Sequence, residues 1–157
     1  MRQTYRVLAS AIAVLVVVQA MMMVWAIAGL FTWIDDGNTL DKSVVEGWSD
    51  EPPTFDGAFG HFIHAFINGT LLIPLCGLLL LIVSFFAKVP RGVALAAAIV
   101  VSIVVQYFAG TLAEPGMPYL GLVHGLNAFI LFGLALFASK SAKEAGMAPQ
   151  SAPTAAM

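Results

Sequence analysis

Charge is what this sequence lacks most. Only 10% of the 157 residues are charged, whereas 60% are hydrophobic. A soluble domain of this length carries about a quarter charged residues, so these few charges cannot cover a water-exposed surface. The apolar residues also occur in long blocks and not in periodic stripes, which indicates a protein surrounded by lipid. The length of 157 residues suits one compact domain.

Cysteine is almost absent too, and the net charge is small. Cys76 is the only cysteine, which excludes an intramolecular disulfide and any cysteine-based metal motif. It lies in an apolar run, where a free thiol packs as a small hydrophobic side chain. The net charge of −2 gives no basis for a nucleic-acid partner.

Four apolar blocks are long enough to cross a bilayer, which needs about 20 residues. The first exceeds the apolar core of a signal peptide, about 7–15 residues, which favours a retained helix over a cleaved one. Pro74, in the second, is expected to bend its helix because it removes the hydrogen bond to the carbonyl of Thr70. We therefore predict an all-α integral membrane four-helix bundle, antiparallel and up-down-up-down, within residues 1–138. The predicted spans are 7–34, 58–87, 93–112 and 119–138.

Two polar segments lie outside these spans. Residues 35–57 hold seven of the nine acidic residues. Apolar residues recur there at helical spacing, which predicts either a short amphipathic helix on the membrane surface or an irregular acidic loop. These apolar residues are Leu40, Val44, Val45 and Trp48. Residues 139–157 are rich in Ala, Ser, Pro and Lys and are predicted to form a disordered cytoplasmic tail.

The basic residues predict the orientation in the membrane. With four spans, six of the seven lie on one side, and only Lys42 lies on the other. The positive-inside bias then places both termini and the 88–92 turn in the cytoplasm, with the acidic loop outside. We expect a multi-pass protein of the inner (plasma) membrane. The six basic residues are Arg2, Arg6, Lys88, Arg91, Lys140 and Lys143.

All three histidines fall within predicted spans, where a polar group is costly and needs a reason. At the helical rise, His64 lies about 9 Å and His124 about 8 Å from the outer boundary. Gln106, on the third span, has a similar depth. Asn68 and Asn127 lie on the same helix faces as His64 and His124, respectively. The sequence thus predicts one polar layer in the outer leaflet.

Two neutral imidazoles that face each other from two helices suit the axial positions of a haem iron. We therefore predict that His64 and His124 ligate one b-type haem between the second and fourth helices. His61 is the alternative ligand on the second helix, or a partner for a haem propionate. Gln106, Asn68 and Asn127 are expected to support the histidines.

Two other interpretations stay open. Histidine, asparagine and glutamine also form interhelical hydrogen bonds that only hold a bundle together. Alternatively, His61, His64 and His124 supply three nitrogen donors, enough to bind zinc or copper directly. A proton pathway is less favoured, because no carboxylate lies within the spans to complete a relay.

Short motifs give a resemblance over residues 58–138. The segments 60–64, 82–87 and 122–128 resemble those of a family of small bacterial four-helix membrane proteins of unknown function. The layout is also similar to one half of haem A synthase, whose second and fourth helices carry haem-ligating histidines.

The synthase resemblance implies His61 or His64 as one ligand and His124 as the other. This sequence departs from the synthase pattern because its second span has no carboxylate near the histidine, so haem hydroxylation is not implied. We expect a small haem-binding protein with no assigned enzymatic activity. It would act in electron transfer or as an accessory of a respiratory or redox complex in the lipid bilayer.

Overall fold

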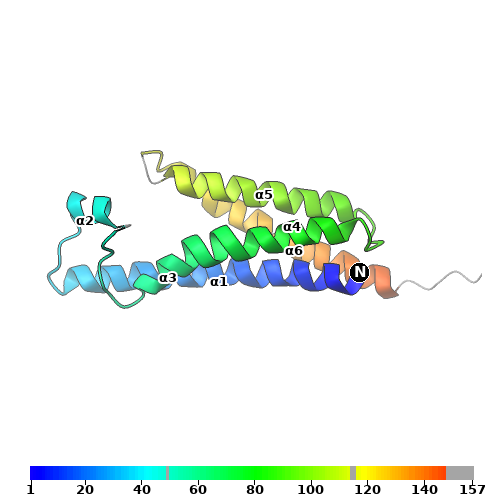
Figure 1. Ribbon diagram of the computed structural model, residues 1–157, viewed down its shortest axis with the longest axis horizontal. Helices are drawn as coiled ribbons and strands as arrows, with labels where there is room; N and C mark the ends of the chain where they lie inside the picture. Colours follow the sequence, from blue (N-terminus) through cyan, green and yellow to red (C-terminus); the bar gives the residue numbers. More distant parts are fainter. Residues whose placement is uncertain (49, 114–115, 148–157) are drawn as a thin grey trace, which may run out of the picture.

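Four long apolar helical segments make up the fold (Figure 1). The structure is a computed structural model that describes residues 1–48, 50–113 and 116–147. Each segment has the length and composition to cross a membrane. The prediction of an all-helical protein with four apolar helices is confirmed. The segments are Arg2–Asp35, Ala58–Ser84, Gly92–Ala113 and Leu120–Met147.

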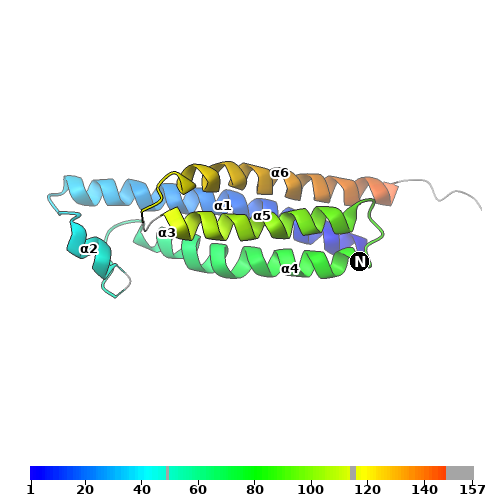
Figure 2. The same ribbon diagram turned by 90° about the horizontal axis from the view of Figure 1, so that it is seen from above.

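The four segments pack as a bundle in which each contacts its neighbours in the sequence. Helix α1 (Arg2–Asp35) packs against α4 (Ile73–Ser84) and α6 (Leu120–Met147), and α5 (Gly92–Ala113) packs against the same two. Helices α1 and α5 therefore lie diagonally opposite each other, as do α4 and α6. Figure 1 shows the N-terminus and the α4–α5 turn at one end and α2 at the other, and Figure 2 shows the bundle from above.

The buried apolar core lies toward the end that holds the N-terminus. The phenolic oxygen of Tyr5 donates a buried hydrogen bond of 3.0 Å to the backbone carbonyl of Gly92, which ties α1 to the start of α5. Small residues on α1, α5 and α6 let the helices approach closely. The fully buried members of this core are Tyr5, Ala9, Ile12, Leu80, Ala96, Ile99, Ala135 and Ala138.

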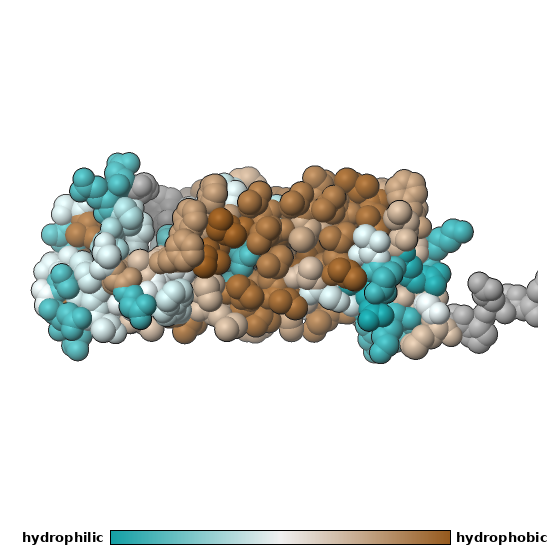
Figure 3. Space-filling model, turned by 60° about the horizontal axis from the view of Figure 1, so that its bottom comes forward, coloured by the Kyte–Doolittle hydropathy of each residue, from teal (hydrophilic) through white to brown (hydrophobic). Residues whose placement is uncertain are grey.

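The outer surface of the bundle is apolar as well. Figure 3 shows a hydrophobic band across the middle of the face in view, with hydrophilic residues gathered toward both ends. Leu122 and Phe129 on α6 are 78% and 77% exposed, and many other large apolar side chains face outward. Contiguous apolar surface of this extent is rare on soluble monomers and fits a membrane protein.

The second segment changes its hydrogen-bonding register within its length. It begins as α3 (Ala58–Phe62), continues as a π-helix, η1 (Ile63–Leu72), and ends as α4. Pro74 is the second residue of α4. Proline has no N–H to donate to the carbonyl four residues earlier, so the normal α-helical ladder is already interrupted there. The sequence predicted a bend at Pro74, and the structure shows a register change just before it.

Helix α6 extends nine residues beyond the predicted end of the fourth span. The prediction of a disordered tail from residue 139 is therefore wrong for 139–147. Alanine, lysine and glutamate favour helix, and Lys140 lies 3.8 Å from Glu144 one turn later. A hydrogen bond of 2.8 Å also joins the hydroxyl groups of Ser139 and of Ser10 on α1. The rest of the predicted tail, 148–157, lies outside the described residues.

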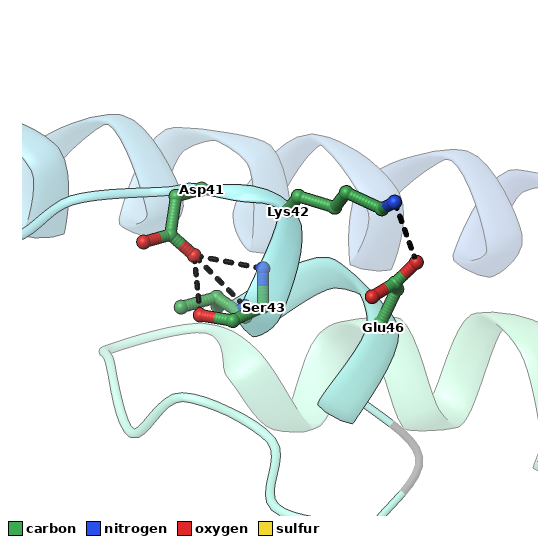
Figure 4. Close-up of polar contacts among 5 residues, drawn as sticks. Asp41, Lys42, Ser43 and Glu46 are labelled. Atoms are coloured by element: carbon green, nitrogen blue, oxygen red, sulfur yellow. Dashed lines mark hydrogen bonds and ion pairs between the residues drawn. The ribbon is translucent and has the colours of Figure 1, made fainter.

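A short helix, α2 (Lys42–Gly47), forms within the acidic loop. The Asp41 carboxylate caps its N-terminus by accepting bonds from the backbone N–H groups of Ser43 and Val44 (Figure 4). Lys42 and Glu46 form an ion pair one turn apart, at 3.4 Å. Of the two interpretations for this loop, the short helix is the one the structure contains.

Candidate functional site

The structure brings His64 and His124 together inside the bundle. His64 lies on η1 and His124 on α6, and their ring centroids are 6.1 Å apart with an angle of 46° between the ring planes. The two histidines are 60 positions apart in the sequence, and their contact agrees with the prediction that they lie in one layer of the bundle. Their role as ligands stays a prediction.

Each of these histidines is held by a backbone carbonyl of a neighbouring helix. Nδ1 of His64 lies 3.0 Å from the carbonyl oxygen of Gln19 on α1. Nδ1 of His124 lies 3.0 Å from the carbonyl oxygen of Gln106 on α5. A carbonyl oxygen only accepts, so Nδ1 must carry the proton in both rings. In the neutral imidazole, Nε2 is then left with a free lone pair, which is the arrangement of a metal-ligating histidine.

Gly110 leaves the space that the His124 ring occupies. A Cβ at Gly110 on α5 would lie 2.9 Å from Nδ1 and 3.0 Å from Cε1 of His124. An imidazole is rigid, so any side chain at this position would force the ring to move. The absence of a side chain at Gly110 therefore lets His124 reach the carbonyl of Gln106.

Amide and hydroxyl groups next to His124 form a complete hydrogen-bonded network between α5 and α6. The side-chain nitrogen of Asn127 donates to the backbone carbonyl of Ser102 at 2.8 Å and to Oε1 of Gln106 at 2.7 Å. The Ser102 hydroxyl donates back to Oδ1 of Asn127 at 3.0 Å. Asn127 is buried, and this network satisfies each of its polar atoms, as a polar group in a membrane interior requires.

The His64 side of the layer is not satisfied in the same way. Asn68, one turn after His64 on η1, is only 2% exposed, and its side-chain nitrogen has no hydrogen-bond partner. Oε1 of Gln19 is also buried without a partner. An unpaired donor thus lies one turn from His64, and an unpaired acceptor belongs to the residue whose carbonyl holds His64. Orphaned buried polar atoms are rare and often mark a functional site.

The π-helix contains this half of the site. His64 and Asn68 both lie within η1, whose ten residues are a long stretch for a π-helix. Such segments are rare, and they often occur at functional sites, because the wider register turns side chains to new directions. Together with the orphaned atoms, η1 indicates that this face has a role beyond packing.

His61 belongs to different surroundings. It lies on α3, and its ring packs against Trp48 with a centroid distance of 5.9 Å. Trp48 in turn contacts Phe55, which contacts Trp33, so His61 joins a chain of aromatic rings beside the acidic loop. Within the described ranges, no group of three or more His, Cys, Asp or Glu side chains is placed to hold a metal ion. The three-histidine metal site is therefore not supported.

Sequence reasoning placed the two histidines but missed what orients them. The Gln19 and Gln106 carbonyls could not be identified, because every residue carries a carbonyl. Ser102 was not predicted to join the network, although it lies four residues before Gln106 and therefore on the same helix face. The contact of Gly110 with the His124 ring was not predicted.

Comparisons of the chain with protein-family models, curated proteins and solved structures find no match.

Proposed function

We propose that this chain is a small integral membrane protein in which His64 and His124 ligate one b-type haem. The observation that supports this most is the pairing of the two rings. Both donate Nδ1–H to a carbonyl, both keep Nε2 free, and their centroids are 6.1 Å apart. The four apolar segments would span the bilayer antiparallel, up-down-up-down, with both termini on the cytoplasmic side of the inner (plasma) membrane.

The separation of the rings fits two ligands of one metal ion. Each histidine would offer an imidazole nitrogen, a donor that haem iron takes from proteins, and the two ring centroids are 6.1 Å apart. His64 and His124 come from diagonally opposite segments, and facing helices are where the ligands of cofactors in helix bundles are found.

The chain's own residues would orient the ligands. Donation from Nδ1–H to a carbonyl fixes the tautomer and the direction of each ring, and it makes Nε2 more basic. When bound, haem supplies one-electron redox chemistry. We propose an electron-transfer or accessory role beside a respiratory or redox complex in the bilayer, which is also what the resemblance of the sequence layout to half of haem A synthase implies.

The visible spectrum of the protein tests this proposal. Protein purified in detergent after expression with ample haem is expected to show sharp reduced α and β bands on adding dithionite. His64→Ala and His124→Ala should each abolish the six-coordinate spectrum. His61→Ala is the matched control and should retain it, because the ring of His61 packs against Trp48. Colourless wild-type protein, or unchanged bands in His124→Ala, would contradict the proposal.

A second candidate is a structural role without a cofactor. The complete network of Ser102, Gln106 and Asn127 supports it, because such hydrogen bonds alone can join α5 to α6. On this alternative the protein stays colourless, and His124→Ala lowers its stability because the bond to Gln106 is lost. The spectrum and a stability measurement on the same two histidine variants therefore separate the candidates.

A further inference from the structure

A cavity of about 400 Å³ lies between the start of α1 and the end of α6, far from the histidines. Three cationic side chains line it: Arg2 and Arg6 from α1, and Lys143 from α6. Ala142 and Met147 add an apolar wall. Among the described residues that line the cavity, none is acidic.

Within the described part of the chain, the cations of this cavity have no carboxylate partner. The ion pairs found there are Lys42–Glu46 and Lys140–Glu144, and neither includes a residue of the cavity. Three positive charges that share one cavity repel each other, and this repulsion is relieved when an anion binds between them. The cavity therefore favours an anionic ligand.

The Arg2 side chain indicates which kind of anion the cavity favours. Its Nε–H is buried and has no hydrogen-bond partner in the structure. Leaving a buried donor of a charged group without a partner costs more free energy than leaving a neutral donor unpaired, so we expect this donor to have a partner. The guanidinium of arginine presents a planar fork of N–H donors that matches the oxygens of a phosphate. A Cβ at Gly146 would lie 3.7 Å from a terminal nitrogen of Arg2, so the Arg2 side chain runs beside the end of α6.

The position of the cavity also fits a phosphate. It lies where the hydrophobic band of the molecule gives way to a hydrophilic patch, at the end that carries the N-terminus (Figure 3). In a membrane this is the level of the lipid headgroups, and basic pockets between helices at this level bind anionic headgroups. A general excess of cytoplasmic charge would need neither a cavity nor a buried donor. Lys140, exposed and paired with Glu144, is an example of such a charge.

We propose that the cavity of Arg2, Arg6 and Lys143 binds an anionic phosphate group, as carried by a phospholipid headgroup or by free phosphate. The Nε–H and terminal N–H groups of Arg2 donate to the phosphate oxygens. Arg6 and Lys143 neutralise its charge from either side. The inference is independent of haem, because the cavity shares no residue with the His64 and His124 site.

Binding is measured by native mass spectrometry of the full chain in a non-ionic detergent. The probes are phosphatidylglycerol, zwitterionic phosphatidylcholine and inorganic phosphate. We expect phosphatidylglycerol to bind more tightly than phosphatidylcholine. Arg6→Gln and Lys143→Gln should each weaken binding about fivefold, the effect of one charge near a membrane surface. Arg2→Lys keeps the charge but removes Nε–H, and it should also weaken binding.

Lys140→Gln is the matched control, since it removes one charge three residues from Lys143 and should leave binding unchanged. If phosphatidylglycerol binds and phosphate does not compete, the ligand is a lipid headgroup; if millimolar phosphate competes, it is the free anion. Either result supports the site. Equal binding of both lipids with no binding of phosphate, or equal weakening by Lys140→Gln and Lys143→Gln, would overturn it. Unchanged melting temperatures show that each variant is folded.

Discussion

The two halves of the bundle bury different kinds of side chain. In the half near the N-terminus, the buried positions are filled by apolar residues such as Ile12, Leu80 and Ile99. In the other half, the buried positions include Asn68 and Asn127, and two histidine rings face each other nearby. Apolar packing stabilises the first half. The second half carries polar groups whose burial costs free energy unless they are hydrogen-bonded or bind a ligand.

The backbone is also less regular in the polar half than in the apolar half. Helix α4 is a regular α-helix where it packs in the apolar half, whereas η1 is a π-helix where it carries His64. Inside the apolar half, the Tyr5 hydroxyl is paired with the Gly92 carbonyl and the Ser84 hydroxyl with the Leu81 carbonyl, and the unpaired Nε of Arg2 lies at the outer end of this half. The polar half leaves Gln19 and Asn68 with unpaired atoms. Among the described residues, the π-helix and two of the three unpaired buried atoms thus occur in the half that holds the histidines, which supports a functional role for that half.

The largest effect is expected from Leu80→Ala in the apolar half. Leu80 is completely buried, so the truncation leaves a cavity and should lower the free energy of unfolding by about 2–5 kcal/mol. The matched control is Leu78→Ala on the same helix, because Leu78 is exposed on the apolar outer surface. Unfolding in mixtures of mild detergent and dodecyl sulfate measures both. A haem spectrum unchanged in folded Leu80→Ala would show that the halves are independent, whereas equal losses in the two variants would contradict the assignment of the core.

Gly110→Ala tests the polar half with a single methyl group. The new Cβ would press on the His124 ring, and overpacking of this kind costs about 1–3 kcal/mol. The displaced ring should also shift or weaken the haem bands. Gly125→Ala is the control, since it lies next to His124 in sequence but its Cβ would meet nothing within 4 Å. Identical spectra and stabilities for the two variants would show that Gly110 does not position the ring.

The four apolar segments and the pairing of His64 with His124 could be predicted from the sequence, because both follow from block length and depth along a helix. Three features could not. The π-helix depends on how η1 packs against α1, and Pro74 alone indicates only an interruption. The contact of Gly110 with His124 joins two helices. The extension of α6 to Met147 depends on contacts such as Ser10 with Ser139, which composition does not reveal.

A smaller effect is expected from the amide network. Asn127→Leu removes three hydrogen bonds and leaves Ser102 and Gln106 without their partner, and interhelical hydrogen bonds in membranes contribute about 0.6 kcal/mol each. We expect a loss of about 1–2 kcal/mol in the same unfolding assay. The double variant with Ser102→Ala should lose less than the sum of the single variants. Strict additivity would show that the two side chains do not interact.

The smallest effect lies outside the bundle, at the cap of α2. Hydrogen bonds from the Ser43 hydroxyl and the backbone of Val44 hold the pKa of Asp41 below its usual value of 3.8. The cap therefore stabilises α2 above this pH and is lost as the pH falls through the lowered pKa. Carbon chemical shifts of residues 43–47 should lose helical character in that acidic range. Asp41→Asn should make them independent of pH, because asparagine also caps; a persisting transition would assign it to another group.

The central claim is that the polar half of the bundle holds one haem between His64 and His124. The most direct measurement is the amount of haem per chain in wild-type protein and in the double variant His64→Ala/His124→Ala, both purified from cells with ample haem. The account predicts one haem per wild-type chain and none in the double variant, with both proteins folded. Wild-type protein without haem, or equal haem in both proteins, would contradict it.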